Sequence, residues 1–145
     1  MFKKIQLILT IFIVLNFYNL STAEENFFKE AKKKFDEKEL EDSKFLFQRN
    51  IVFNPKDAKS YLYLAKIYNS EENEREEEKN LNTALLLEPT NEEAMFMLIN
   101  IRLKRSNYSE VKELKEKFLI ICSNLCKKIN SINESLKNIE PKKDS

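Results

Sequence analysis

The sequence predicts an all-α fold, built as a short array of helical hairpins. Two prolines, Pro55 and Pro89, lie 34 residues apart, and the apolar residues on either side of them recur at the same interval. Along the rest of the chain, apolar residues recur every three or four positions, as they do in amphipathic helices. No segment shows the alternating pattern of a strand. A period of this length is typical of stacked helix-turn-helix units.

The repeat can be followed residue by residue. A small residue in each unit allows two helices to approach closely, the large residues fill the space beside it, and the proline ends a helix. Before the two prolines, the residues that match are Phe53 and Leu87, Ile51 and Leu85, Phe47 and Leu81, Leu40 and Glu74, and Ala31 and Ala65. After them, Tyr61, Leu64, Ala65 and Tyr68 match Met95, Leu98, Ile99 and Arg102.

The apolar period predicts seven helices after the N-terminal segment. They pair as 26–36 with 39–53, 57–69 with 73–87, and 91–104 with 108–121, and a last helix covers 124–139. The turns contain Asn, Pro and Ser in place of glycine, as in Asn54-Pro55 and Ser106-Asn107. Residues 141–145 are expected to be a disordered tail.

These residues resemble the tetratricopeptide repeat (TPR) family, whose units have 34 residues, a small residue in each helix, aromatic residues beside them and a proline near the end. On this register the units begin at Glu24, Ala58 and Glu92, and the resemblance covers about 100 of the 145 residues. It implies a right-handed superhelical array of about three repeats over 24–57, 58–91 and 92–122. A capping helix over 123–139 would complete one domain, 24–140.

The units depart from the family pattern at three positions. Ile99 replaces the small residue that Ala31 and Ala65 supply, Glu77 replaces the small residue of the second helix, and Ser123 stands where a proline is usual. Terminal units are often atypical. We therefore expect the third unit to be the least regular, and a shift of register near Glu77.

Residues 1–23 are expected to be an export signal. Lys3 and Lys4 precede an apolar stretch from Ile5 to Phe17, and Ser21-Thr22-Ala23 offers small residues for cleavage. The stretch is shorter than the ~20 apolar residues of a spanning helix, so we expect cleavage, with an uncleaved N-terminal anchor as the alternative. The expected location is the periplasm; secretion and tethering to the inner membrane are the alternatives.

Charge and composition disfavour several classes of function. Removal of the signal would take two of the 25 basic residues and none of the 24 acidic ones, which leaves a net charge of −1. A near-neutral chain has no general attraction for nucleic acid or for an anionic membrane. The sequence contains no glycine and no histidine. Phosphate-binding loops, Ser-His or Cys-His catalysis and most zinc sites are therefore disfavoured, and we expect no catalysis, cofactor or metal.

Two further patterns each allow two interpretations. An acidic run at 71–78 is expected to be a solvated helix start, where the helix dipole favours acids; a site for calcium or a basic partner is the alternative. An apolar stripe in the last helix is expected to cap the array, because it is too short for a coiled coil. Homo-oligomerisation through this stripe is the alternative. The stripe consists of Leu125, Ile129, Ile132, Leu136 and Ile139.

The TPR resemblance also implies a binding groove, which the first helix of each hairpin lines. An apolar row beside a row of two lysines and an amide would suit an extended or helical peptide with apolar anchors and at least one carboxylate. The family's clamp for a chaperone C-terminus is not reproduced, and the apolar members could instead pack against neighbouring helices. The implied groove residues are Phe28, Lys32, Phe35, Leu62, Lys66, Asn69, Phe96, Asn100 and Leu103.

Cys122 and Cys126 are the two cysteines of the chain. In an exported protein an even number of cysteines suggests a disulfide, which would be easier if Ser123 began a new helix and placed the pair across a turn. Two buried free thiols are one alternative. Redox chemistry is another, although the spacing has one residue more than the thioredoxin-type motif.

The sequence thus favours a non-catalytic adaptor or scaffold of the cell envelope, which binds a protein or peptide partner in a shallow groove. A thiol-disulfide redox protein that uses Cys122 and Cys126, and a self-associating structural subunit, are the alternatives.

Overall fold

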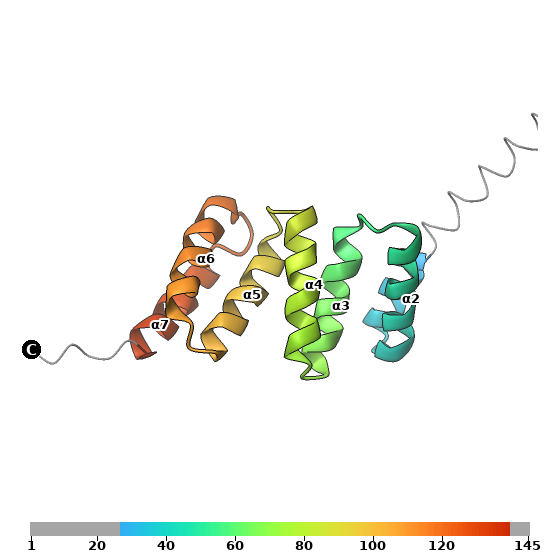
Figure 1. Cartoon of the computed structure of the whole chain (residues 1–145), viewed down its shortest axis with the longest axis horizontal. Helices are drawn as coiled ribbons and strands as arrows, with labels where there is room; N and C mark the ends of the chain where they lie inside the picture. Colours follow the sequence, from blue (N-terminus) through green and yellow to red (C-terminus); the bar gives the residue numbers. More distant parts are fainter. Residues whose placement is uncertain (1–26, 140–145) are drawn as a thin grey trace, which may run out of the picture. The chain divides into compact units, whose positions relative to one another are not determined.

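The computed structural model describes residues 27–139 (Figure 1). The predicted signal segment and the predicted C-terminal tail lie outside the described residues. Between 27 and 139 all the regular secondary structure is helical, which confirms the predicted all-α helical repeat. The helices are 27–36, α2 (Leu40–Phe53), α3 (Ala58–Ser70), α4 (Glu74–Leu87), α5 (Glu92–Lys104), α6 (Tyr108–Ile121) and α7 (Lys128–Ile139).

The contacts divide the chain into two units between Lys56 and Asp57. This boundary lies one residue before the expected junction of the first and second repeats. Unit 1 contains the helix 27–36 and α2, and unit 2 contains α3 to α7.

In unit 1, small residues bring the two helices together. Ala31 is fully buried, and its carbonyl oxygen accepts a hydrogen bond of 2.9 Å from the hydroxyl of Ser43, which is also buried. Beside this contact the rings of Phe28 and Phe47 meet edge to face, with their centroids 5.7 Å apart. The small side chains allow the close approach, and the aromatic rings fill the space next to it.

Unit 2 has one apolar core, to which all five of its helices contribute. Figure 1 shows α3 to α6 side by side, each antiparallel to the next, and α7 packs on α5 and α6. The most extensive helix pairing is that of α3 with α4, where Ala65 is fully buried. The core consists of Leu62, Ala65, Leu81, Ala84, Ala94, Met95, Leu98, Ile99, Ile101, Val111, Leu114, Phe118, Ile132 and Leu136.

The second repeat keeps its register, so the shift expected near Glu77 does not occur. Ser43, Glu77 and Val111 lie 34 residues apart along the chain and all three are buried. The register holds because the side chain of Glu77 has a partner inside unit 2: Asn69 Nδ2 donates a hydrogen bond of 3.0 Å to Glu77 Oε1. A buried polar group with a hydrogen-bond partner costs far less than one without.

The third hairpin packs less extensively than the second. Ile99 is fully buried at the position where the second hairpin has Ala65. A β-branched side chain at a helix crossing holds the two backbones further apart than alanine does. The irregularity expected of the third unit therefore has a direct cause in α5.

The turn inside each hairpin has the same backbone geometry. Lys38, Glu72 and Ser106 all have positive φ, at 67°, 57° and 56°, and they are 34 residues apart. Each ends its helix with the same pair of hydrogen bonds: in the second hairpin, Glu72 N donates to Asn69 O and Asn73 N donates to Tyr68 O. This is the Schellman ending, in which glycine is the usual left-handed residue.

Side-chain caps set the starts of the inner helices. The oxygens of Asp57, Asn73, Asn91 and Asn107 accept hydrogen bonds from amides in the first turns of α3, α4, α5 and α6. Each cap satisfies an amide that the helix itself leaves without a partner.

The C-terminal segment requires a correction. The last helix begins at Lys128, not at residue 123 or 124, because residues 122–127 form a turn. Cys122 and Cys126 are joined by a disulfide across this turn, with their Cα atoms 5.2 Å apart. Ile132 and Leu136 of the predicted stripe are buried in the core of unit 2, and Leu125 and Ile129 pack against that core.

An ion-pair network joins α4, α5 and α6 at one end of unit 2. Arg102 Nη2 lies 2.5 Å from Glu78 Oε1, and Arg102 Nε lies 2.7 Å from Glu110 Oε1. Arg105 Nε and Nη1 lie 2.6 Å from Glu74 Oε1 and 2.7 Å from Glu78 Oε2. Burial acts to raise the pKa of Glu78, but hydrogen bonds from the two arginines outweigh it and hold the pKa below its usual value.

Candidate functional site

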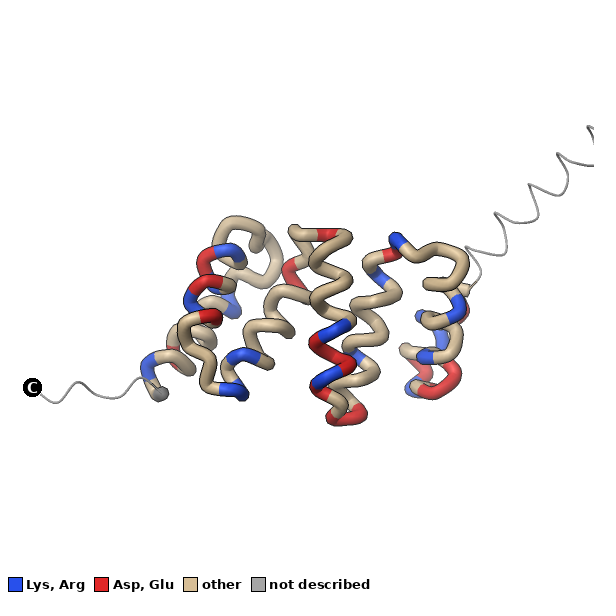
Figure 2. The backbone as a smooth tube through the Cα atoms, in the orientation of Figure 1, with Lys and Arg blue, Asp and Glu red and all other residues tan. Residues whose placement is uncertain are grey.

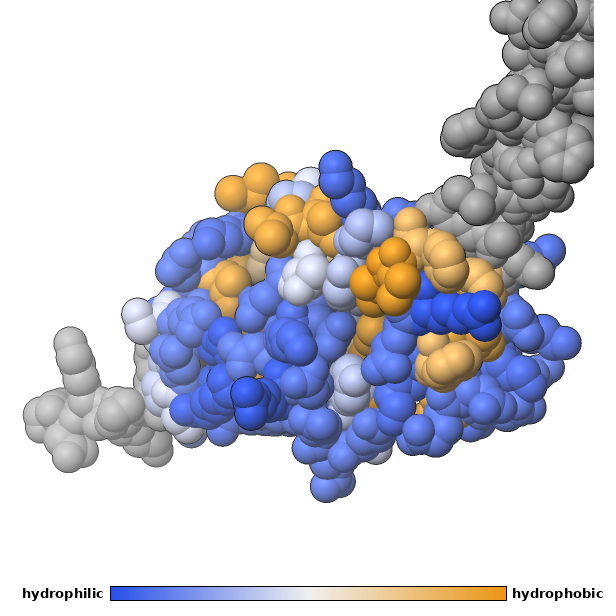
Figure 3. Space-filling view, turned by 45° about the vertical axis from the view of Figure 1, so that its right-hand side comes forward, coloured by the Kyte–Doolittle hydropathy of each residue, from blue (hydrophilic) through white to orange (hydrophobic). Residues whose placement is uncertain are grey.

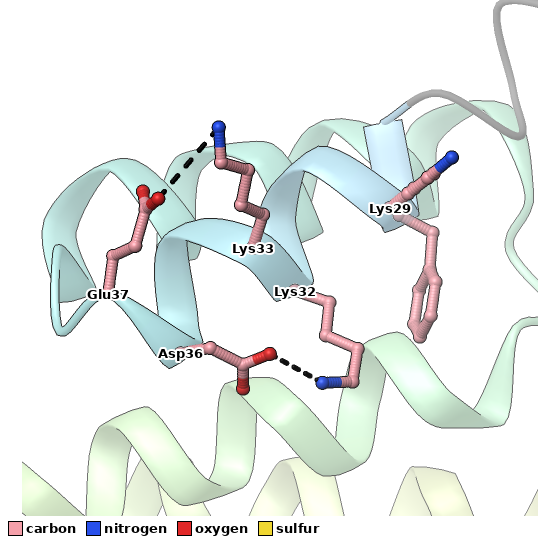
Figure 4. A pocket seen from close by; sticks show the side chains of 6 residues that line it. Lys29, Lys32, Lys33, Asp36 and Glu37 are labelled. Carbon is pink, nitrogen blue, oxygen red and sulfur yellow. Dashed lines mark hydrogen bonds and ion pairs between the residues drawn. The ribbon is translucent and has the colours of Figure 1, made fainter.

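Three of the expected groove residues, Phe28, Lys32 and Phe35, belong to the helix 27–36 of unit 1. Phe28 and Lys32 line a hollow of about 470 Å³ with Lys29, Lys33, Asp36 and Glu37 (Figure 4). Lys32 Nζ lies 2.6 Å from Asp36 Oδ2, and Lys33 Nζ lies 3.8 Å from Glu37 Oε1. Five of the six lining residues lie on the helix 27–36 and Glu37 follows it directly, and Lys32 and Lys33 already face carboxylates. Among residues 27–56 the hollow therefore has no second wall that could hold a ligand.

Three other groove residues meet at one hollow of unit 2. Asn69 at the end of α3 and Asn100 and Leu103 on α5 line a depression of about 390 Å³, together with Glu77, Met97, Ile101 and Lys104. The walls thus come from three helices. They combine two amide side chains, which can both donate and accept hydrogen bonds, with an apolar surface. Such a mixture suits a peptide, which presents both backbone amides and side chains.

The remaining groove residues are engaged with other parts of unit 2. Leu62 is buried in the core. Lys66 Nζ lies 2.8 Å from Glu93 Oε2 and 4.8 Å from the centroid of the Tyr63 ring. Phe96 is half-buried: its ring centroid lies 6.2 Å from that of Phe118, and Lys128 Nζ of α7 lies 5.3 Å from it. The capping helix therefore occupies one side of Phe96.

Glu77 was not among the expected groove residues, although its departure from the repeat pattern marked it as unusual. Its side chain is only 3% exposed, yet it lines the hollow of Asn69 and Asn100. Burial raises the pKa of Glu77 above its ordinary value, against the opposing effects of the hydrogen bond from Asn69 and the charge of Lys104. The hollow thus has a carboxylate in its wall.

A second hollow in unit 2 is apolar, and no motif in the sequence pointed to it. It measures about 290 Å³ and is lined by Leu85, Pro89, Met95, Lys117, Ile120 and Ile121. Near it in the chain, Leu86 and Ile120 are 80% and 85% exposed. The 34-residue interval could have identified these residues in the sequence. Val52, Leu86 and Ile120 lie 34 residues apart, and all three are exposed aliphatic residues. Figure 3 shows such apolar patches on a mainly hydrophilic surface.

The disulfide turn is held by a carboxylate from α5. The hydroxyl of Ser123 donates a hydrogen bond of 2.6 Å to Glu92 Oε1, and the backbone amides of Asn124 and Leu125 donate to Glu92 Oε2 at 3.0 and 2.8 Å. These hydrogen bonds, with that of Ser123 the strongest, lower the pKa of Glu92 to about 2. The contacts give the turn a structural role in fastening α7 to α5.

Two other kinds of site were sought in the same part of the chain. Between residues 27 and 139, no cluster of three or more His, Cys, Asp or Glu side chains is arranged to hold a metal ion. Among the described helices, none combines the length and the apolar character needed to cross a membrane.

The sequence matches no family model, and no curated protein matches it significantly. Solved structures are similar in fold. The first TPR domain of Spaghetti (RPAP3), bound to the HSP90 peptide SRMEEVD, has a TM-score of 0.71 at 14% identity, over 81% of this chain and 94% of that one. The TPR2B domain of yeast Sti1 in complex with pHsp70 has a TM-score of 0.70 at 15% identity, over 79% and 96%.

A bacterial structure is similar to the same extent. The Yersinia enterocolitica type III secretion chaperone SycD, in complex with a peptide of the translocator YopD, has a TM-score of 0.69 at 15% identity, over 83% of this chain and 94% of that one. These likenesses agree with the 34-residue period, the buried Ala31 and Ala65 and the paired antiparallel helices. The chain therefore has the fold of a TPR domain.

Proposed function

We propose that this chain is a non-catalytic adaptor, and that unit 2 binds a peptide segment of its partner along α3 and α5. The observation that carries the proposal is the meeting of Asn69, Asn100 and Leu103 at one open hollow. Asparagine amides can hydrogen-bond to the backbone of a bound peptide, and the apolar wall can take a side chain. The peptide-bound structures of similar fold support the same use.

The test begins with a peptide display selection against the full chain. Asn100→Ala is then expected to weaken the selected peptides by about tenfold, since it removes one hydrogen-bonding group from the hollow. Asn82→Ala is the matched control, because Asn82 is exposed on α4 and does not line the hollow. Isothermal titration calorimetry measures the affinity of the selected peptides for the parent and for both variants. Equal affinities for the two variants and the parent would contradict the proposal.

We further propose that the adaptor works in the cell envelope. The N-terminal signal pattern motivates this setting, and the Cys122–Cys126 disulfide supports it, because disulfides persist in oxidising compartments. Cell fractionation, with an intact-mass measurement before and after reduction, tests the proposal. A reduced chain found only in the cytosol would contradict it.

A further inference from the structure

Glu77 occupies a buried position where packing alone would call for a small or an apolar side chain. The residues 34 positions before and after it, Ser43 and Val111, are a small side chain and an aliphatic one, and both are buried. Burial of a carboxylate costs free energy, and the chain accepts this cost in one of its three repeats. A charged group that is kept in a buried position beside a hollow is a candidate for ligand recognition.

The structure leaves Glu77 only partly compensated. Asn69 Nδ2 donates the one hydrogen bond that its carboxylate receives within residues 27–139. No ion pair of these residues includes it either. The charged groups that act on it are Lys104, which favours the ionised form, and Glu74, which opposes it. One carboxylate oxygen therefore remains for a donor that enters the hollow.

The neighbouring arginines are not available to fill this role. Arg102 and Arg105 are held by Glu74, Glu78 and Glu110 in the network at the start of α4. Lys104 is exposed at the wall of the same hollow. Figure 2 shows acidic positions gathered at the start of α4 and in the turn before it, and basic ones at the end of α5. Six of the eight residues at 71–78 are acidic, and three of them, Glu74, Glu76 and Glu78, are paired with basic side chains, whereas Glu77 is in no ion pair of residues 27–139.

The apolar wall of the hollow has the chemistry of a site for a long basic side chain. Met97, Ile101 and Leu103 can pack against an alkyl stem, while Glu77 and the amides of Asn69 and Asn100 face its polar head. By contrast, the lysines expected to bind a partner carboxylate already have acidic partners: Lys32 faces Asp36, and Lys66 faces Glu93. Charge complementarity thus favours a basic partner residue over an acidic one.

We propose that the hollow of α3, α4 and α5 binds a lysine or arginine side chain of the partner, with Glu77 as its counter-ion. The inference rests on the proposed peptide-binding function and names the residue class that the groove selects. A preference for a basic partner residue would distinguish this groove from one that recognises an acidic peptide. A guanidinium or ammonium group would complete the hydrogen bonding of the buried carboxylate, which makes the contact short and specific.

The direct test uses two small probes, n-butylguanidinium and its neutral isostere N-butylurea, with the full chain and amide NMR. Butylguanidinium is expected to shift the amides of Asn69, Glu77 and Asn100 with saturation, and butylurea is not. Glu77→Gln should abolish these shifts. Glu76→Gln is the matched control: it removes the same charge one residue away, from a carboxylate that pairs with Lys79 outside the hollow. Equal shifts from both probes, or shifts that persist in Glu77→Gln, would overturn the proposal.

Lys104 supplies a second variant, which tests the same site in the opposite direction. The positive charge of Lys104 acts to lower the pKa of Glu77, and the same charge would repel a cation that enters the hollow. Lys104→Ala should therefore strengthen the binding of butylguanidinium, by about twofold or more for an exposed charge. Weaker binding in this variant would count against Glu77 as the counter-ion.

The selected peptides separate this inference from the proposed function. Peptides that bind the hollow are expected to carry an arginine or lysine, and exchange of that residue for citrulline or methionine should cost at least about tenfold in affinity. Peptides that bind the hollow without a basic residue, and equally well in Glu77→Gln, would overturn the inference but leave the adaptor function. Binding of butylguanidinium without any peptide binding would contradict the adaptor function and support the cation site.

Discussion

At the scale of single residues, the turns show how this chain forms repeats without glycine. Lys38, Glu72 and Ser106 each occupy the left-handed region at the end of the first helix of a hairpin. For a residue with a Cβ this conformation costs about 1 kcal/mol or more, and glycine would avoid the cost. The chain tolerates it three times because the two Schellman hydrogen bonds that end each of these helices require that geometry.

Glu72→Gly is therefore expected to raise the free energy of unfolding by about 1 kcal/mol. Glu71→Gly is the matched control, since Glu71 has a φ of −86° and gains nothing from a glycine. It should lower the stability, because glycine adds entropy to the unfolded chain. Urea unfolding measures both variants. A loss of stability in Glu72→Gly would contradict the account of the turns.

The buried carboxylate of Glu77 makes a second residue-scale prediction. Because burial raises its pKa in the folded state, the folded chain binds the proton more tightly than the unfolded chain does. Its unfavourable effect on stability is absent below the ordinary pKa of 4.5 and grows as the pH rises from there through the folded pKa. Glu77→Gln should therefore be more stable than the parent at pH 7 and equally stable at about pH 4.

Thermal unfolding at the two pH values measures this difference. Glu76→Gln is again the control and should show little change at either pH. A Glu77→Gln variant that is less stable than the parent at pH 7 would mean that the carboxylate contributes more to the fold than its burial costs.

At the scale of elements, the attachment of α7 depends on two contacts outside the helix itself. The disulfide closes the turn before α7, and Glu92 of α5 receives the hydrogen bonds of Ser123, Asn124 and Leu125. The stripe on α7 then buries Ile132 and Leu136. The helix is short, so its stability must come from this packing and from the two fastenings.

Reduction of the disulfide should loosen α7 before the rest of unit 2. The closed loop is small, and its chain entropy is worth only about 2 kcal/mol. Hydrogen exchange measures the effect: amides of α7 should exchange about tenfold faster or more after reduction, while those of α3 and α4 keep their protection. Cys122→Ser with Cys126→Ser should reproduce the result. Equal acceleration in all helices would contradict a local role for the turn.

The contact of Glu92 should make the same element sensitive to acid. Its pKa is about 2 in the folded chain against an ordinary value of 4.5, so its contribution to stability is present above pH 4.5 and is lost as the pH falls toward 2. In thermal unfolding, the parent should lose more stability over this range than Glu92→Gln does. Glu116→Gln is the control, since Glu116 is exposed on α6. Parallel losses in the parent and in Glu92→Gln would contradict the role of Glu92.

At the scale of the whole molecule, local signals predicted most of the architecture. The inner helices begin where Asp57, Asn73, Asn91 and Asn107 supply caps, and these are contacts between neighbours in the chain. The start of α7 was predicted about four residues too early, because Ser123 and Asn124 resemble a cap. In the structure they bond to Glu92, which lies 31 and 32 residues away.

The candidate site was predictable only in part, for the same reason. The repeat register identified Asn69, Asn100 and Leu103, which the fold brings to one hollow. It could not reveal that Lys66 pairs with Glu93, or that Phe96 lies beside Lys128 of α7, because these contacts join different helices. Glu77 was visible as an exception to the pattern, but its place in the wall of the hollow required the packing of α3, α4 and α5.

The most direct test of the account is to map a selected peptide onto the full chain by amide NMR. The adaptor mechanism predicts that the largest shifts fall on α3 and α5 around Asn69, Asn100 and Leu103, and that Asn100→Ala reduces them. Unit 2 offers one clear competitor, the apolar surface of Leu86 and Ile120. Shifts centred on that surface, with none at the hollow, would contradict the central claim.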